Sequence, residues 1–187
     1  MFQRTFIAAV LVLIVGGCAS GGSKITDFSD RSVGYGWLDI KDIDANRLHS
    51  VVVFQHRPQT SEPYYNVAVK KFKDGYLYYS FAFPKGAFKT YSAEGQFCIG
   101  LCGNTIHSYS FGKQGDAAAV IINEPGVYHF GSYKLQEVKT GLFEQGKFEA
   151  VPANNAPTQK EMLQEILKDT EKYPTIAKRI NQELGNS

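Results

Sequence analysis

The segment from Leu48 to Pro152 carries one short strand pattern after another, and this succession limits the possible folds more than any other feature. The clearest case is Tyr76–Phe83, where every second side chain falls on the same face of an extended strand. One of its two faces carries Leu77, Tyr79, Phe81 and Phe83. Because this face is the more apolar, the alternation predicts that it points into the core.

Turn signals separate these strands at intervals of eight to twelve residues. Lys73-Asp74-Gly75-Tyr76 predicts a two-residue hairpin, because Asp-Gly suits the two positive-φ positions of a type I′ turn. Pro125-Gly126 suits a type II turn and predicts a second hairpin, with arms at Ala119–Ile122 and Val127–Leu135. A last short strand is expected at Gly146–Val151.

Such a series predicts a mainly β domain, an antiparallel β-sandwich over residues 31–152. Helical patterns are missing between the strands, so parallel crossovers lack the residues they need. The chain contains 11 Tyr and 13 Phe, side chains that pack well on a pleated sheet. The start Pro125–Tyr128, which follows an aliphatic strand, resembles the prealbumin-like sandwiches of several envelope lipoproteins. That resemblance implies a prealbumin or immunoglobulin-like sandwich.

The pattern changes to helical in the tail, residues 153–187. Thr158 and Glu161 have the spacing of a capping box, in which each side chain bonds the backbone NH of the other residue. Past the break at Tyr173-Pro174, Thr175 is expected to cap a second helix that Gly185 ends. Two roles fit this helical appendage: it packs on the sandwich, or it forms an arm that binds a partner.

The first residues have the order of a secretory signal. Arg4 supplies a positive charge, and Phe6–Val15 is an apolar run about half as long as the ~20 residues of a membrane-spanning helix. Val15-Gly16-Gly17-Cys18 then resembles the lipobox of bacterial lipoproteins. The resemblance implies removal of residues 1–17, a lipid on the Cys18 sulfur and an acylated new amino terminus. An ordinary signal with a chance cysteine and an uncleaved anchor are the alternatives.

Residues 18–30 would then form the lipidated terminus and a flexible tether, since Ala19–Ser23 contains only small residues and glycine. In enterobacteria-like lipoproteins an Asp after the lipidated cysteine favours retention at the inner membrane. The residue here is Ala19, so the resemblance implies a periplasm-facing location at the outer membrane. Two or more acyl chains make such an anchor durable, whereas a single chain binds only marginally.

Cys98 and Cys102 are the remaining cysteines, and export would place them in an oxidising compartment. An extended strand would hold their Cα atoms roughly 13 Å apart, too far for a disulfide. A disulfide is therefore expected across a reversal of the chain at Gly100. Free thiols, or a metal site that adds His107, are the alternatives, although the spacing matches no standard zinc motif.

Few residues in the sequence suggest a catalytic or metal-binding site. Asp42, Asp44 and Asn46 begin like a calcium loop, but Arg47 and Val53 stand where the loop needs Gly and Glu. A looser oxygen site at Asp39, Asp42 and Asp44 and a solvated loop remain as alternatives. The four histidines are scattered, and His107-Ser108 lacks a nucleophile elbow. No catalytic residue, resident metal or cofactor is therefore expected.

Tyrosines are the strongest binding candidates, because a Tyr side chain offers a large contact area at low entropic cost. They could line an exposed face that stacks on sugars or on a protein, or they could be half-buried sheet residues with hydrated hydroxyls. The candidates are Tyr64, Tyr65, Tyr76, Tyr78 and Tyr91.

A formal charge of +2 without a long basic run argues against a nucleic-acid partner. From the lipobox, the aromatic-rich strands and the lack of a catalytic motif, we expect a membrane-anchored envelope protein with a non-catalytic role, which binds a protein or glycan or scaffolds a complex. A small-molecule or metal-binding protein is the alternative, and a hydrolase is a weaker one.

Overall fold

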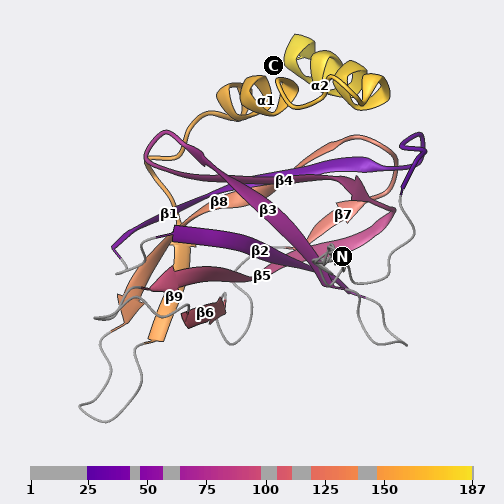
Figure 1. Ribbon diagram of the computed structural model, residues 1–187. Helices are drawn as coiled ribbons and strands as arrows, with labels where there is room; N and C mark the ends of the chain where they lie inside the picture. The colour runs from indigo at the N-terminus through magenta and orange to yellow at the C-terminus, as the bar shows by residue number, and fades with distance from the viewer. Residues whose placement is uncertain are drawn as a thin grey trace, which may run out of the picture.

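The computed structural model describes residues 25–42, 47–56, 64–97, 105–110, 119–138 and 147–186. The protein is mainly β, and two short helices follow the strands (Figure 1). Among the described residues, none of the helices is both long and apolar enough to cross a membrane. The elements are β1 (Ser32–Asp42), β2 (Arg47–His56), β3 (Tyr64–Phe72), β4 (Gly75–Phe83), β5 (Gly86–Phe97), β6 (Thr105–Ser110), β7 (Val120–Ile122), β8 (Val127–Val138), β9 (Lys147–Pro152), α1 (Gln159–Leu167) and α2 (Pro174–Asn186).

The strands follow the order β6-β5-β2-β3-β4-β1-β8-β9, and β7 pairs with β5. β3 belongs to two sheets, because its first half pairs with β2 and its second half, from Val69, pairs with β4. The end strands β6 and β9 lie close together. The sheet holding β4, β1, β8 and β9 thus folds back over the sheet holding β2, β5, β6 and β7 (Figure 1).

β1 is the central strand of its sheet, and the expected order of strands did not include it. It pairs antiparallel with β4 and parallel with β8, so the β1–β8 pair departs from the antiparallel pairing that the sequence predicted. All residues from Ser32 to Ile40 are buried. Gly34 and Gly36 make this possible, because a Cβ there would lie 2.6 Å from the Phe83 ring and 2.2 Å from the Tyr78 hydroxyl oxygen, respectively.

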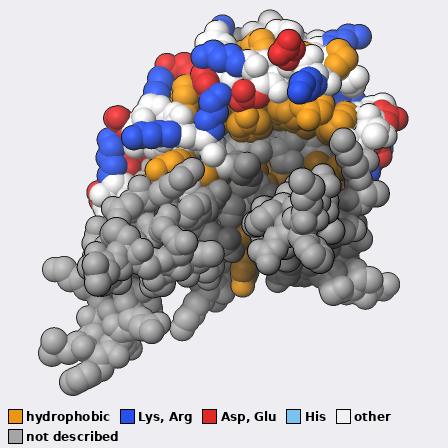
Figure 2. All heavy atoms as spheres, viewed as in Figure 1, with side chains coloured by type: hydrophobic (Ala, Val, Ile, Leu, Met, Phe, Trp, Pro, Cys, Tyr) orange, Lys and Arg blue, Asp and Glu red, His pale blue; other side chains and the backbone are white. Residues whose placement is uncertain are grey.

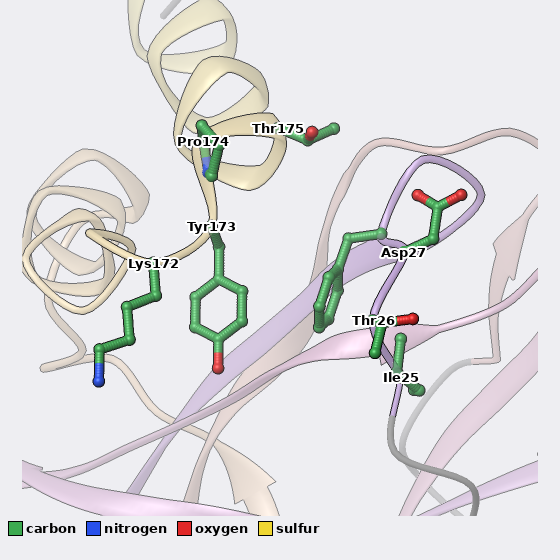
Figure 3. Close-up of a pocket in the computed structure, with 8 residues that line it drawn as sticks. Ile25, Thr26, Asp27, Lys172, Tyr173, Pro174 and Thr175 are labelled. Atoms are coloured by element: carbon green, nitrogen blue, oxygen red, sulfur yellow. The ribbon is translucent and has the colours of Figure 1, made fainter.

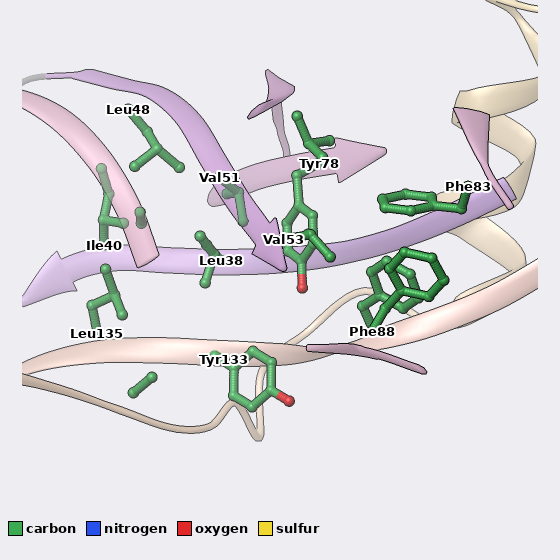
Figure 4. Packing of buried hydrophobic residues seen from close by; sticks show 14 of the residues in the cluster. Leu38, Ile40, Leu48, Val51, Val53, Tyr78, Phe83, Phe88, Tyr133 and Leu135 are labelled. Carbon is green, nitrogen blue, oxygen red and sulfur yellow. The ribbon is translucent and has the colours of Figure 1, made fainter. Parts of the chain in front are cut away.

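The main core fills the space between the two sheets (Figure 4). Phe83 lies at the centre of its aromatic part, with ring centroids 5.1 Å from Phe88 and 4.8 Å from Phe130. Both contacts are edge-to-face, the geometry that aromatic quadrupoles favour. The aliphatic part comes from Leu38, Ile40, Leu48, Val51, Val53, Val67, Ile122 and Leu135.

A second core lies on the opposite face of β1 and β4, beneath the helices. Trp37 is fully buried there, and its indole nitrogen donates to the Phe72 carbonyl at 3.2 Å. The other buried members are Val33, Tyr35, Leu77, Met162, Leu163, Ile166, Ile176 and Ile180. The helical tail therefore packs on a sheet, as the first of the two expected alternatives proposed.

β4 is covered on both faces, by the helices on one side and by the facing sheet on the other. The prediction that only one face of this strand points into a core was therefore only half correct. Leu77 points toward the helices, whereas Tyr78 is fully buried between the sheets. Phe83, expected on the same face as Leu77, belongs to the core between the sheets. The β1–β4 register shifts between Ser32/Phe83 and Gly34/Ser80, which gives β4 one extra residue. A bulge of one residue moves every following side chain to the other face.

The first hairpin is present, but its turn lies one residue earlier than expected. Phe72 pairs with Gly75, so Lys73 and Asp74 form the turn, and Lys73 takes the positive φ of 51°. The second expected hairpin was wrong. β7 pairs with β5 and β8 with β1, so the bend before Val127 connects the two sheets. The buried Ser32 hydroxyl holds this bend by accepting from the Gly126 NH at 3.2 Å.

The helix caps were partly predicted. The Thr158–Glu161 capping box is confirmed, with both reciprocal side-chain to backbone bonds present. α2 differs from the expectation because Pro174 is its first residue, so Thr175 lies inside the helix and does not cap it. Proline suits that position, since its missing NH would have no partner within the helix. Gly185 is also helical, and α2 continues to Asn186.

Candidate functional site

A pocket of about 410 Å³ lies where the first described residues meet the start of α2 (Figure 3). One wall is the segment Ile25–Phe28, and the other is the corner Lys172–Thr175. Figure 3 shows Tyr173 projecting between the two walls. The pocket therefore joins two segments that lie almost 150 residues apart in the sequence.

Arg179 on α2 holds the first wall in place. Its guanidinium donates to the carbonyl oxygens of Phe28 at 2.9 Å and Ser29 at 2.6 Å, and also to that of Arg31. On the same turn, Asp27 accepts from the backbone NH and the hydroxyl of Ser29 at 2.8 and 2.9 Å. These bonds lower the pKa of Asp27. Phe28 and Ser29, which were expected to belong to the end of the tether, are thus bonded to α2.

A row of aromatic side chains leads from the pocket along the lower edge of the helices. Phe28 and Tyr173 have ring centroids 5.0 Å apart, and Tyr173 and Phe81 are 5.2 Å apart. Phe81 and Tyr79 continue the row at 5.5 Å. All four rings are only partly buried. Figure 2 shows a band of hydrophobic side chains directly beneath the charged surface of the helices. We call Phe28, Tyr173, Phe81 and Tyr79 the aromatic row.

An ionic cluster closes the far end of the aromatic row. The Tyr79 hydroxyl donates to the Asp169 carboxylate at 2.5 Å, and the Lys70 ammonium contacts the same oxygen at 2.9 Å. Lys70 also pairs with Glu165 at 2.8 Å. The Tyr79 hydrogen bond is the main cause that lowers the pKa of Asp169, whereas burial mainly raises that of Tyr79. The cluster fastens α1 and the residues after it to β3 and β4.

A histidine and a serine meet on β8, outside the pocket. The His129 Nε2 atom lies 3.2 Å from the Ser132 hydroxyl oxygen, and the His129 ring lies 5.1 Å from that of Tyr35. Burial lowers the pKa of His129, because desolvation disfavours the charged imidazolium. The Tyr35 hydroxyl donates instead to the Gln159 side chain at 3.0 Å. The His129–Ser132 contact thus joins two residues of β8 at the bulge in its pairing with β1.

The tyrosines singled out from the sequence do not share an exposed face. Tyr78 is fully buried between the sheets, where its hydroxyl lies 3.3 Å from both the Thr90 hydroxyl oxygen and the Gly131 carbonyl oxygen. Tyr65 and Tyr76 pack against the same core. Tyr91 is 48% exposed on β5. The side chain of Tyr64 lies outside the described residues.

The cysteines cannot be placed in the same way. Cys18, Cys98 and Cys102 lie outside the described residues, and so does His107 as a side chain. The lipid attachment, the disulfide and its metal alternative therefore remain predictions.

The aspartates of the expected oxygen site have separate partners. Asp39 is 2% exposed and accepts from the Lys41 NH and the Asn155 amide, both at 2.9 Å. Asp42 pairs with Lys134 at 2.6 Å. Asp44 lies outside the described residues. In the part of the chain that the structure describes, no group of three His, Cys, Asp or Glu side chains is arranged to hold a metal ion.

Sequence reasoning missed the aromatic row and the pocket. Two signals were available: Tyr79 and Phe81 share a strand face with Leu77, and Tyr173-Pro174 interrupts the helical pattern. Neither signal shows that Phe28 comes to lie beside Tyr173, because that contact depends on the Arg179 bonds across the fold.

Comparisons with known proteins identify no family. No family model matches the chain, and no curated protein matches it. One solved structure with some likeness is a leucine-rich repeat protein from Bacteroides thetaiotaomicron. The likeness has 12% sequence identity and a TM-score of 0.34, and it covers 57% of this chain but only 12% of the other. A similarity at this level carries no argument about fold or function.

Proposed function

We propose that this chain is a lipoprotein of the bacterial cell envelope, anchored to the outer membrane through Cys18, with a non-catalytic binding or scaffolding role. Support for the anchor comes from the order of charge, apolar run and lipobox in the first 18 residues. Support for a binding role comes from the aromatic row, whose partly exposed rings end at a pocket of about 410 Å³.

The aromatic row is the single observation that carries the binding role. Isolated exposed rings are common on soluble proteins, but contiguous ones mark interaction sites more often. Tyr and Phe are also enriched at protein interfaces. The ionic cluster at Tyr79 and the Arg179 bonds hold both ends of the row in place, so a partner meets a preformed surface. We propose a protein or a glycan of the envelope as that partner.

We also propose that the two facing sheets form a sandwich of the prealbumin type. The shared core between the sheets and the antiparallel pairing of most strands support this assignment. The parallel β1–β8 pair is a departure from a purely antiparallel sandwich.

Mass spectrometry of the purified native protein tests the anchor. The expected species begins at Cys18 and carries acyl chains, and Cys18→Ser should abolish the added mass. A species that begins at Met1, or one with an unmodified thiol at position 18, contradicts the proposal.

Site-specific crosslinking in intact cells tests the binding role. A photoreactive residue replaces Lys168, an exposed residue next to Asp169 at the Tyr79 end of the aromatic row, and a matched variant carries it at the exposed Lys41 at the end of β1. The expected result is a discrete protein or glycan adduct from position 168 and none from position 41. Equal, diffuse labelling from both positions contradicts a binding role for the aromatic row.

The pocket also favours a second candidate, a small-molecule carrier, because it lies within the usual size range of ligand sites, about 300–1,000 Å³. Native mass spectrometry of protein isolated from its membrane distinguishes this candidate. A stoichiometric small ligand that Thr26→Trp displaces supports the carrier, and its absence leaves the macromolecular partner as the proposal.

A further inference from the structure

The surface around Ile25 must be the part of the domain nearest to the proposed lipid. Only residues 19–24 separate Cys18 from Ile25. Fully extended, the seven steps between their Cα atoms span at most about 25 Å, and a flexible Gly/Ser-rich chain of that length averages about 15 Å. A domain of this size is about 40 Å across. The tether is therefore shorter than the domain, and it keeps the surface around Ile25 within about 25 Å of the lipid.

The far end can be identified from β1. This strand has 11 residues and spans about 35 Å. It starts at Ser32, four residues after Phe28 of the pocket wall, and it ends at Lys41 and Asp42. Those two residues pair with Asp74 and Lys134, so the turn between β3 and β4 lies at the far end too.

The near end has the side chains that suit a membrane–water interface. Phe28 and Tyr173 are in ring contact and partly exposed, and Ile25 lines the same pocket. Aromatic side chains favour the headgroup level of a bilayer, where the ring meets apolar groups and the hydroxyl stays hydrated. Lys172 lines the pocket, and Lys178 lies one helical turn beyond Pro174 and Thr175 on α2; both lysines are exposed. Long lysine side chains reach headgroup phosphates while their stems cover apolar surface.

Acidic groups on this corner limit its net charge. Asp27 lines the pocket and Glu171 is exposed next to Lys172, so two carboxylates offset the charge of the two lysines. Hydrogen bonds from Ser29 already occupy Asp27. Attraction to anionic lipid alone therefore does not explain a contact here. The aromatic and aliphatic side chains must contribute, and a surface of mixed phosphate and amine headgroups suits this balance of charges.

We propose that the corner formed by Ile25, Phe28, Lys172, Tyr173 and Lys178 rests on the headgroups of the bilayer that holds the Cys18 lipid. The inference rests on the proposed lipid anchor and adds an orientation to it. The pocket end of the domain faces the membrane, and the far end of β1 points away. A partner then reaches the protein at the Tyr79 end of the aromatic row or on the sheet that holds β2 and β5.

Photocrosslinking of the full lipidated chain tests this orientation. The chain is reconstituted in vesicles of phosphatidylethanolamine and phosphatidylglycerol at 3:1, with a trace of phospholipid carrying a headgroup diazirine. We expect at least fivefold more lipid adducts on peptides covering residues 25–28 and 172–178 than on those covering Lys41 and Lys134. Equal labelling of both ends, or an excess at the far end, overturns the inference.

Two variants separate adhesion from simple closeness to the membrane. Insertion of twelve Gly and Ser residues after Gly22 lengthens the tether, and a corner with its own affinity should keep its excess of adducts. Loss of that excess overturns the inference. The double change Lys172→Glu and Lys178→Glu should lower labelling of the corner about threefold, while Lys160→Glu, an exposed lysine on α1, should leave it unchanged. Equal behaviour of the two charge variants also overturns it.

Vesicle flotation keeps the two proposals distinguishable. If the chain fails to float with the vesicles, the lipid anchor fails, whatever the labelling pattern. If the chain floats but its corner is not labelled preferentially, the anchor stands and the orientation fails.

Discussion

Replacing Gly36 by alanine should destabilise the protein strongly, because two strands crowd the place of the added methyl group. The new Cβ would lie 2.2 Å from the Tyr78 hydroxyl oxygen and 2.4 Å from the Gly131 carbonyl oxygen. Ordinary contacts need about 1 Å more, and a backbone carbonyl within a sheet cannot move that far without disturbing its pairing. Overpacking of this kind costs roughly 1–3 kcal/mol.

The Tyr78 hydroxyl adds to this cost. It lies 3.3 Å from both the Thr90 hydroxyl oxygen and the Gly131 carbonyl oxygen in a fully buried site. If the ring moves away from the methyl group, these polar groups lose their partners, which costs about 1–3 kcal/mol. We expect Gly36→Ala to lower the free energy of unfolding by about 2–6 kcal/mol, a large part of the usual 5–15 kcal/mol.

Urea unfolding followed by fluorescence measures this loss. Trp37 is the single tryptophan and is fully buried, so its emission reports the folded state. The matched control is Gly185→Ala, since nothing lies within 4 Å of the added Cβ on α2. It should leave stability unchanged or raise it by up to about 1 kcal/mol, as expected for alanine in a helix.

A double variant makes the reasoning refutable. Tyr78→Phe alone should cost about 1 kcal/mol, because Thr90 and Gly131 lose a hydrogen-bond partner. In the Gly36→Ala background the same change removes the nearest clashing atom, while the Tyr78 Cζ atom at 2.3 Å and the Gly131 carbonyl oxygen remain, so it should cost clearly less than it does alone. Strictly additive effects, or a loss below about 1 kcal/mol for Gly36→Ala with an unchanged urea slope, refute the steric explanation.

Three further changes test the helix layer. Thr158→Ala removes the cap of α1 and should cost about 1 kcal/mol in urea unfolding, whereas Thr158→Ser should be nearly neutral; equal losses would contradict the capping role. The Lys73 ion pair and the Thr158 bonds lower the pKa of Glu161 from 4.5 to about 2, so their stabilisation is complete above pH 4.5 and is lost as the pH falls toward 2. Glu161→Gln should therefore flatten the acid limb of a stability–pH profile, and an unchanged limb speaks against the pair. Ile166→Ala empties a fully buried site and should cost about 2–5 kcal/mol in a single transition seen by Trp37 fluorescence and by circular dichroism; a separate early loss of helix would show that the tail is an independent arm.

Local signals predicted the elements better than they predicted the pairing. The Thr158–Glu161 box and the Tyr76–Phe83 strand follow from spacing within a few residues, and both are present. β1 escaped notice because Gly34 and Gly36 lack the side chains that mark a strand. Their role depends on Phe83 and Tyr78, which reach them from β4.

The pairing of the strands and the position of the candidate site depend on contacts between segments that are distant in the sequence. Pro125-Gly126 has the composition of a hairpin turn, yet Ser32, more than 90 residues earlier, holds it as a bend between sheets. The bulge in β4 moves Phe83 to the other face. The two-residue alternation of side chains is interrupted there, and the sequence pattern alone does not reveal the interruption. For the same reason the aromatic row was missed, because Phe28 and Tyr173 lie 145 positions apart in the sequence and meet only in the folded domain.

The position of β1 has a consequence for the order in which the protein folds. Among the described elements this strand is made first, its partners β4 and β8 follow about 40 and 90 residues later, and α2, which covers its outer face, is the last. A nascent chain therefore exposes Trp37 and its apolar neighbours until α2 has been synthesised. Late closure of such distant contacts makes folding slow and favours aggregation of incomplete chains.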